Sequence, residues 1–280
     1  LVPVYSGAEM EAKKKIIHSL EDPLSSLKSV EDAAIYFGFI KNCPKGSELL
    51  SMRCIYLIAQ LDIKLDELVS LVKELYKTKI QDIRIIASVL HLIEPQDIIA
   101  EIPSLIKLNS HLIKESLTKI LKLSRVENKM KSIEILLFLH KMVENDQTTA
   151  KDVAKAISAC FELPNIFHLD DFIECLNLIV ASVDNGSSKR FPIVFMRTLL
   201  ICLATYSRSV VNSIKLFNNI FSPNISKNLQ KRSRKCLFDN KMLIEGFELW
   251  CIKTFPHCLS ILQMTSESEL KMILSVRYSL

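Results

Sequence analysis

Six histidines and eight cysteines are the side chains with which this chain could hold a metal ion. Zinc hydrolases place two histidines one helical turn apart, whereas the histidines here are scattered: His18, His91, His111, His140, His168 and His257. Cys251, His257 and Cys258 come nearest to a ligand cluster, but their spacing matches no structural zinc pattern and offers no fourth ligand. The five glycines are also isolated, which excludes a phosphate-binding loop. The sequence therefore predicts no metal site and no cofactor.

Nucleophilic catalysis would need a thiol or hydroxyl beside a general base. Cys160 and Cys175 are the candidate nucleophiles, but the cysteines mostly lie in apolar stretches without a CxxC pair, which is typical of reduced core thiols in an intracellular protein. The carboxylates of Asp170-Asp171 are interpreted as the start of a helix, where negative charge complements the helix dipole. His140 ends an apolar run and is expected to be a half-buried, hydrogen-bonded side chain. We expect no catalytic residue.

Basic residues concentrate in one acid-free segment. No Asp or Glu occurs between Asp184 and Asp239, whereas ten Lys and Arg lie in that gap, and the whole chain has a net charge of +5. The densest part is a candidate partner-binding cluster of Lys227, Lys231, Arg232, Arg234 and Lys235. Such a cluster could bind phosphates or an acidic protein, or act as a nuclear localisation signal; the alternative is a solvated helix face. Aromatic residues are absent from 227–235, which argues against base-specific RNA recognition, so RNA is a secondary candidate partner.

The elements that position these side chains are expected to be helices. Five glycines and nine prolines are few for the tight turns of a sheet-rich protein of 280 residues, and apolar residues recur with the helical period. The predicted helices cover residues 9–20, 30–42, 47–60, 64–76, 80–92, 95–107, 109–122, 127–145, 149–161, 168–183, 190–207, 208–221, 224–236, 239–255 and 266–277. We predict an all-α, HEAT-like helical-repeat solenoid of antiparallel helix pairs, with a compact helical bundle as the alternative.

Four of these helices begin at capping signals. The signals are Pro95 after Glu94, Thr149 with Asp152, Ser222 before Pro223, and Ser266 with Glu269. No low-complexity linker divides the chain, so residues 1–280 are expected to form a single scaffold domain, with a minor joint at the polar turn 184–188.

The most apolar window is 191–206, which is shorter than a membrane span and contains Arg197. We therefore predict a buried helix rather than a membrane segment, and no membrane partner. Within that helix the guanidinium of Arg197 should be at least partly buried and paired with a carboxylate, for which Glu245 and Glu174 are the candidates.

Two blocks of the sequence follow the pattern of a known family. The first contains Pro192, Met196, Arg197 and Thr198, followed by Tyr206 and Arg208. The second contains Glu245, Gly246 and Phe247, followed by Cys251, Thr254, Pro256 and Leu262-Gln263. Together they resemble the C-terminal domain of symplekin over about residues 150–275. The chain departs from that pattern at Ile244, Phe255 and Met264-Thr265, and its region 208–241 is longer than usual.

The resemblance implies a non-catalytic scaffold of the nuclear machinery for pre-mRNA 3′-end cleavage and polyadenylation. It further implies that the partners are the C-terminal regions of the metallo-β-lactamase-type endonuclease and of its inactive paralogue. The residues of the two blocks are expected to be structural. Two other functions remain open, namely a helical-repeat adaptor for transport or trafficking and a nucleic-acid-binding solenoid that uses the cluster at 227–235.

Overall fold

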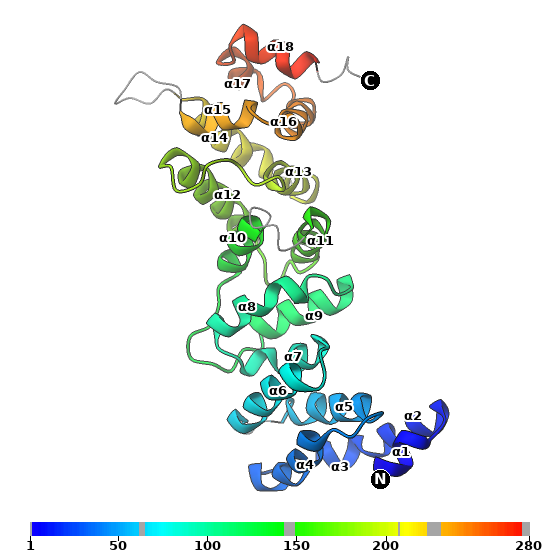
Figure 1. Cartoon of the computed structure of the whole chain (residues 1–280). Coiled ribbons are helices and arrows are strands. Elements are labelled where there is room, and N and C mark those ends of the chain that lie inside the picture. The colour runs from blue at the N-terminus through cyan, green and yellow to red at the C-terminus, as the bar shows by residue number, and fades with distance from the viewer. Residues whose placement is uncertain (1, 62–64, 143–148, 207, 223–230, 276–280) are drawn as a thin grey trace. The chain divides into compact units, whose positions relative to one another are not determined.

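The computed structural model describes residues 2–61, 65–142, 149–206, 208–222 and 231–275 (Figure 1). Within these ranges every regular element is a helix and no strand occurs. The predicted all-α, helical-repeat fold is confirmed. None of the helices in the same ranges is long and apolar enough to cross a membrane.

The chain divides into two compact units, one formed by residues 1–108 and 115–130 and the other by residues 109–114 and 131–280. The turn at 184–188, where a minor joint was expected, lies inside the second unit. That residues 1–280 act as one domain stays a prediction.

Helices of the first unit pack against the next one or two helices along the chain. They are α1 (Val2–Gly7), α2 (Met10–Ser19), α3 (Glu21–Ser25), α4 (Val30–Asn42), α5 (Glu48–Ile58), α6 (Asp66–Thr78), α7 (Arg84–Val89), the 3₁₀ helix η1 (Leu90–Leu92) and α8 (Pro95–Leu105). α5 packs against α3, α4 and α7, and α6 packs against α4 and α7. The next helix, α9 (Ser110–Leu121), contributes residues to both units.

Helices of the second unit form two neighbouring rows. They are α10 (Ser132–Met142), α11 (Ala150–Phe161), α12 (Leu169–Asp184), α13 (Phe195–Thr205), α14 (Ser209–Phe221), α15 (Arg232–Phe238), α16 (Lys241–Thr254), α17 (Leu259–Gln263) and α18 (Glu267–Ser275). In one row α10 packs on α12 and α12 on α15; in the other, α11 packs on α13, α13 on α16 and α16 on α18 (Figure 1). Neighbouring pairs thus bury their apolar faces against each other, as in a helical-repeat protein.

The capping signals explain where several helices start. Pro95 is the first residue of α8, and the side chain of Thr149 accepts a hydrogen bond from the backbone N–H of Asp152 at the start of α11. Ser266 and Glu269 exchange hydrogen bonds between their side chains and backbone N–H groups before α18. Asp171 accepts a hydrogen bond from the backbone of His168, so the interpretation of Asp170-Asp171 as a helix start is confirmed. Ser222 ends α14, and Pro223 lies outside the described residues.

Some helix boundaries differ from the prediction. The helix expected at 127–145 begins at Ser132, because the Glu134 carboxylate accepts a hydrogen bond from the backbone N–H of Lys131 and caps the chain there. The helix expected from residue 190 begins at Phe195, since Pro192 disfavours helical backbone at the residue before it. The helices α1, α3 and α17 were not predicted, because five or six residues are too short to show a period.

Candidate functional site

An aromatic cluster joins α14, α15 and α16 in the core of the second unit. It consists of Phe217, Phe221, Phe238, Phe247 and Trp250. The Phe247 and Trp250 rings are stacked with centroids 5.4 Å apart, and both side chains are fully buried. Phe247 of the second sequence block lies in this core, where its ring packs α16 against Phe217 and Phe221 of α14.

Gly246 lets α16 approach α13 closely. A Cβ atom at this position would lie 2.5 Å from Cβ of Met196, well inside van der Waals contact. Met196 belongs to the first sequence block and Gly246 to the second, so the two blocks meet where these helices cross. Pro192 is also buried, in the segment that leads into α13.

Thr198 and His140 form a buried polar pair between α13 and α10. His140 Nε2 lies 3.0 Å from Oγ1 of Thr198, and Nδ1 lies 2.7 Å from the carbonyl oxygen of Leu136. Because a carbonyl only accepts, Nδ1 of the neutral ring carries the proton. Nε2 faces the Thr198 hydroxyl, which also donates to the Val194 carbonyl oxygen at 3.1 Å. Burial lowers the pKa of His140 to about 4. His140 is thus hydrogen-bonded as expected, but fully buried rather than half-buried.

His140 of this pair also lies beside Cys175, one of the candidate nucleophiles. Cys175 Sγ lies 3.8 Å from Nδ1 of His140, which brings a candidate nucleophile beside a possible base. Burial raises the pKa of Cys175 to about 12 and also raises that of Cys160. Cys175 is 1% exposed and His140 is not exposed at all. A protonated thiol beside a neutral, solvent-excluded imidazole is a packing contact, not an activated nucleophile.

A hydrogen bond joins Cys258 to Cys251. The thiol of Cys258 donates to the carbonyl oxygen of Cys251 at 3.3 Å. Burial raises the pKa of Cys251 to about 12, which disfavours the thiolate that zinc requires. In the described part of the chain no three His, Cys, Asp or Glu side chains come together as metal ligands.

A groove of about 920 Å³ lies over α11, α13 and α16 and contains residues of both sequence blocks. We call it the α13 groove; it is lined by Ala150, Lys151, Asp152, Ala154, Lys155, Ile193, Val194, Met196, Arg197, Leu200, Ile201, Ala204, Met242, Glu245, Gly246 and Leu249. Three large apolar side chains are exposed along it, Met242 at 57%, Leu249 at 48% and Ile193 at 37%. Exposed apolar side chains gathered in one groove are typical of a binding surface.

Charged residues lie among the apolar side chains of the α13 groove. Lys151 and Arg197 are exposed, and Glu245 is half-buried. Asp152 is paired with Lys155, whose Nζ lies 3.4 Å from the carboxylate. The groove therefore presents two cations and one carboxylate beside an apolar floor.

The prediction of a buried, paired Arg197 is wrong. Arg197 is exposed, and no ion pair joins it to Glu245 or Glu174 among the described residues. α13 buries Met196, Leu199 and Cys202 on its inner face, and Arg197 projects from the opposite one. It shares the α13 groove with Glu245 instead of forming a core ion pair.

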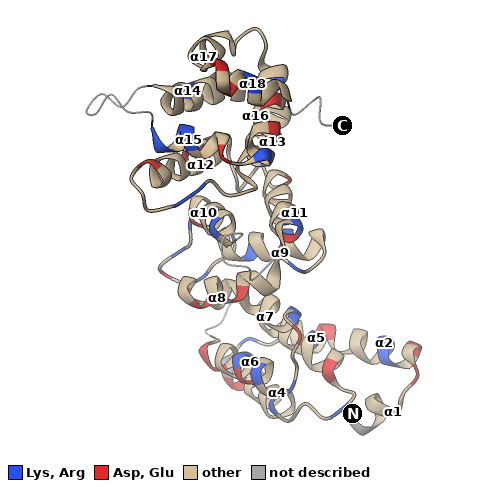
Figure 2. Ribbon diagram, turned by 45° about the horizontal axis from the view of Figure 1, so that its top comes forward, with Lys and Arg blue, Asp and Glu red and all other residues tan. Residues whose placement is uncertain are grey.

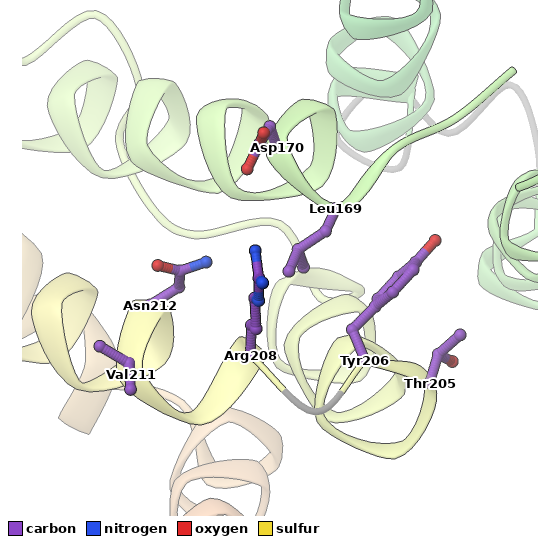
Figure 3. A pocket seen from close by; sticks show the side chains of 7 residues that line it. All are labelled: Leu169, Asp170, Thr205, Tyr206, Arg208, Val211 and Asn212. Atoms are coloured by element: carbon purple, nitrogen blue, oxygen red, sulfur yellow. The ribbon is translucent and has the colours of Figure 1, made fainter.

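A second hollow, of about 740 Å³, lies between α12, the end of α13 and the start of α14 (Figure 3). Arg208 extends between Asn212 and Leu169 toward the first turn of α12, which also carries Asp170 (Figure 3). The Tyr206 ring lies 6.3 Å from the ring of Phe161. This hollow combines one cation and one carboxylate, and the α12 start is already capped by Asp171, so nothing in it selects a ligand.

The basic cluster is divided by the fold. Lys227 lies outside the described residues. Arg234 is turned inward, where its guanidinium lies 2.6 Å from the Glu269 carboxylate and donates to the Met264 carbonyl oxygen at 2.8 Å. Lys231 Nζ donates to the backbone and side-chain oxygens of Asn219, each at 2.7 Å. Of the described members, only Arg232 and Lys235 are exposed, so the alternative of a solvated helix face does not hold for Arg234. That the cluster binds a partner stays a prediction.

The exposed apolar residues of the α13 groove were missed by sequence reasoning. Met242 and Leu249 lie seven residues apart on α16, which is two helical turns, and therefore share a face. That spacing was visible in the sequence, but a second apolar stripe on a helix does not reveal whether it faces the core or solvent.

The family model described as symplekin tight junction protein C terminal matches residues 82–276. This range covers more than half of the chain, includes every residue of the α13 groove, and begins upstream of residue 150, where the resemblance was first visible. No solved structure matches the chain.

Proposed function

Because the chain belongs to the symplekin C-terminal family, we propose that it is a non-catalytic scaffold of the nuclear machinery that cleaves and polyadenylates pre-mRNA 3′ ends. Its partners are the C-terminal regions of the endonuclease and of its inactive paralogue. The buried, protonated thiols beside a neutral His140 support a role in binding rather than in catalysis.

The observation that carries this proposal is the convergence of the two sequence blocks on the α13 groove. Met196 and Gly246 lie at its floor, and Arg197 and Glu245 line it together. The core explains Met196 and Gly246 through close packing. Packing in the core does not explain the charged side chains of Arg197 and Glu245, because Arg197 is exposed and makes no ion pair among the described residues. A partner helix is the natural counterpart of these charges.

The chemistry of the α13 groove fits an amphipathic partner segment. Met242, Leu249 and Ile193 would bury apolar side chains of that segment, and the cations Lys151 and Arg197 would face its carboxylates. The Glu245 carboxylate on α16 would favour a partner segment that places one basic side chain beside it. Charges of both signs beside an apolar floor give such a contact a defined orientation.

Co-purification with the C-terminal regions of the endonuclease and its paralogue tests the proposal. We expect stable association with the wild-type chain and its loss in the double variant Met242→Glu, Leu249→Glu. Burying each of these side chains contributes about 1.5–3 kcal/mol, so the pair should change affinity by at least roughly 100-fold.

Leu274→Glu is the matched control, because Leu274 is 61% exposed on α18 of the same unit and does not line the groove. This variant should bind like the wild type. Unchanged binding by the double variant would refute the groove as the docking site, and absence of binding by the wild-type chain would refute the docking itself.

A further inference from the structure

α15 separates its basic residues between an inner and an outer face. On the inner side, the Arg234 guanidinium lies over the Phe221 ring, 4.7 Å from its centroid, and pairs with Glu269. Arg232 and Lys235 are three residues apart, which places them on one face of the helix, and both are exposed. The outer face of α15 therefore keeps two cations in solvent.

The segment that follows α12 runs along this outer face and brings two more cations to it. Asp184 accepts a hydrogen bond from the Ser233 N–H at 2.8 Å, and the Cys236 thiol lies 3.4 Å from the Lys189 carbonyl oxygen. Gly186 has a φ of 86°, and a Cβ there would lie 3.0 Å from Nη1 of Arg232. The segment 184–189 is thus joined to α15 by two hydrogen bonds and passes close to the Arg232 side chain.

Lys189 and Arg190 are exposed in that segment. Together with Arg232 and Lys235 they form what we call the α15 patch. Figure 2 shows the basic positions of α15 in blue along the ribbon. Lys189 and Arg190 lie more than forty positions before Arg232 and Lys235 in the sequence, so the patch is a product of the fold. It differs from the cluster at 227–235, with which it shares only Arg232 and Lys235. Like charges gathered within a Debye length of about 8 Å reinforce each other's field.

In the described segments that carry the α15 patch, the residues exposed beside its cations are polar. The exposed neighbours between its cations are Asn185, Gly186 and Ser187, and the large apolar side chains that follow, Leu237 and Phe238, are buried. The Asp184 carboxylate accepts a hydrogen bond from the Ser233 N–H, and the exposed Asp239 follows the last residue of α15. Protein interfaces depend on buried aromatic and apolar anchors, whereas phosphate contacts need cations and small polar groups.

We infer that the α15 patch binds the phosphate backbone of an RNA strand without reading its bases. Lys189, Arg190, Arg232 and Lys235 each face one phosphate, and the small polar side chains between them leave room for the sugar–phosphate chain. No aromatic side chain is exposed beside these cations to stack on a base, so binding is independent of sequence. This surface is distinct from the α13 groove, with which it shares no residue.

The test measures binding of the full chain, alone, to a labelled oligouridylate at increasing salt. Four phosphate contacts predict a slope of log affinity against log salt of about −2.8, which is roughly a 50-fold loss between 50 and 200 mM. Replacing all four patch residues by Gln should abolish binding, and Lys189→Gln with Arg190→Gln alone should reduce the slope to about −1.4. The salt slope of this double variant tests the inference even if the fourfold variant fails to fold.

The control replaces Lys131, Lys215, Lys241 and Lys253 by Gln. These four lysines are exposed, belong to the same unit and lie outside the patch, so their replacement removes the same charge as the fourfold patch variant. This control should keep the affinity and slope of the wild type. An equal loss in the control would overturn the inference, because net charge alone would then explain binding. Poly-glutamate bound as tightly as oligouridylate would also overturn it, in favour of an acidic protein partner.

Discussion

Arg232 and Arg234 lie two residues apart on α15, but only Arg234 is expected to matter for stability. The side chains of Arg234 and Glu269 are 11% and 8% exposed, and two hydrogen bonds join them, from Nε at 3.0 Å and from Nη2 at 2.6 Å. Burial alone would raise the pKa of Glu269, but hydrogen bonds from Arg234 and Ser266 hold it below its ordinary value. The carboxylate is therefore ionised and depends on Arg234 for compensation.

Arg234→Ala would leave this carboxylate buried without its partner. Breaking one side of a buried pair costs about 3–5 kcal/mol, and each kcal/mol lowers the melting temperature of a unit of this size by about 2–4 °C. We expect thermal unfolding, followed by circular dichroism, to shift downward by roughly 6–20 °C. Arg232→Ala, at an exposed position, should change the free energy of unfolding by less than about 0.5 kcal/mol.

The pH dependence of this effect has a defined sign. A carboxyl group whose pKa is lowered by folding stabilises the protein above its unfolded pKa, and that contribution is lost as the pH falls through the folded value. The difference between wild type and Arg234→Ala should therefore shrink in acid. Equal melting temperatures for Arg234→Ala and Arg232→Ala at neutral pH would refute the buried pair.

Two further predictions concern the core. His140 has a folded pKa of about 4, below the unfolded value of 6.5, so the unfolded state binds the proton first as the pH falls. Between pH 6.5 and 4 the wild type should therefore lose roughly 3 kcal/mol more stability than His140→Leu. Parallel pH profiles of the two proteins in urea titrations would contradict this. Gly246→Ala should destabilise the protein by about 1–3 kcal/mol through overlap with Met196. Its control, Gly38→Ala on α4, meets no atom within 4 Å and should be neutral or stabilising by up to about 1 kcal/mol.

The helices were predictable because their signals are local. Thr149 with Asp152 and Ser266 with Glu269 cap helices through contacts that span three residues, and the apolar period identifies the faces that pack. Such signals need no knowledge of the rest of the chain. Most helix ranges in the described residues accordingly agree with the predicted ones to within about two residues. The exceptions are the starts of α7, α10 and α13, the short helices α1, α3 and α17, and the helix expected at 224–236, of which residues 224–230 lie outside the described part.

The position of Arg197 was not predictable from hydropathy. On α13, Leu199 and Cys202 face the core, whereas Leu200 and Ile201 are only half-buried and line the α13 groove. A window that averages these residues identifies an apolar helix but not which side is covered. A binding groove and a core face have the same composition, so an arginine among them was assigned to the wrong side.

The division of the basic cluster depends on contacts that are distant in sequence. Arg234 pairs with Glu269, 35 residues downstream, and Ser233 binds Asp184, 49 residues upstream. Charge density along the chain identified the segment correctly as basic. It could not assign Arg234 to the interior, nor bring Lys189 to the same surface as Arg232, because both depend on tertiary packing.

The most direct test of the scaffold role is hydrogen exchange of the full chain with and without the C-terminal regions of the endonuclease and its paralogue. The proposed docking predicts slower amide exchange in α13 and α16 when the partners are bound, because covering the α13 groove suppresses local opening of these helices. Exchange in α4 and α6 of the first unit should not change. Unchanged exchange throughout α13 and α16 in the presence of saturating partner would contradict the account.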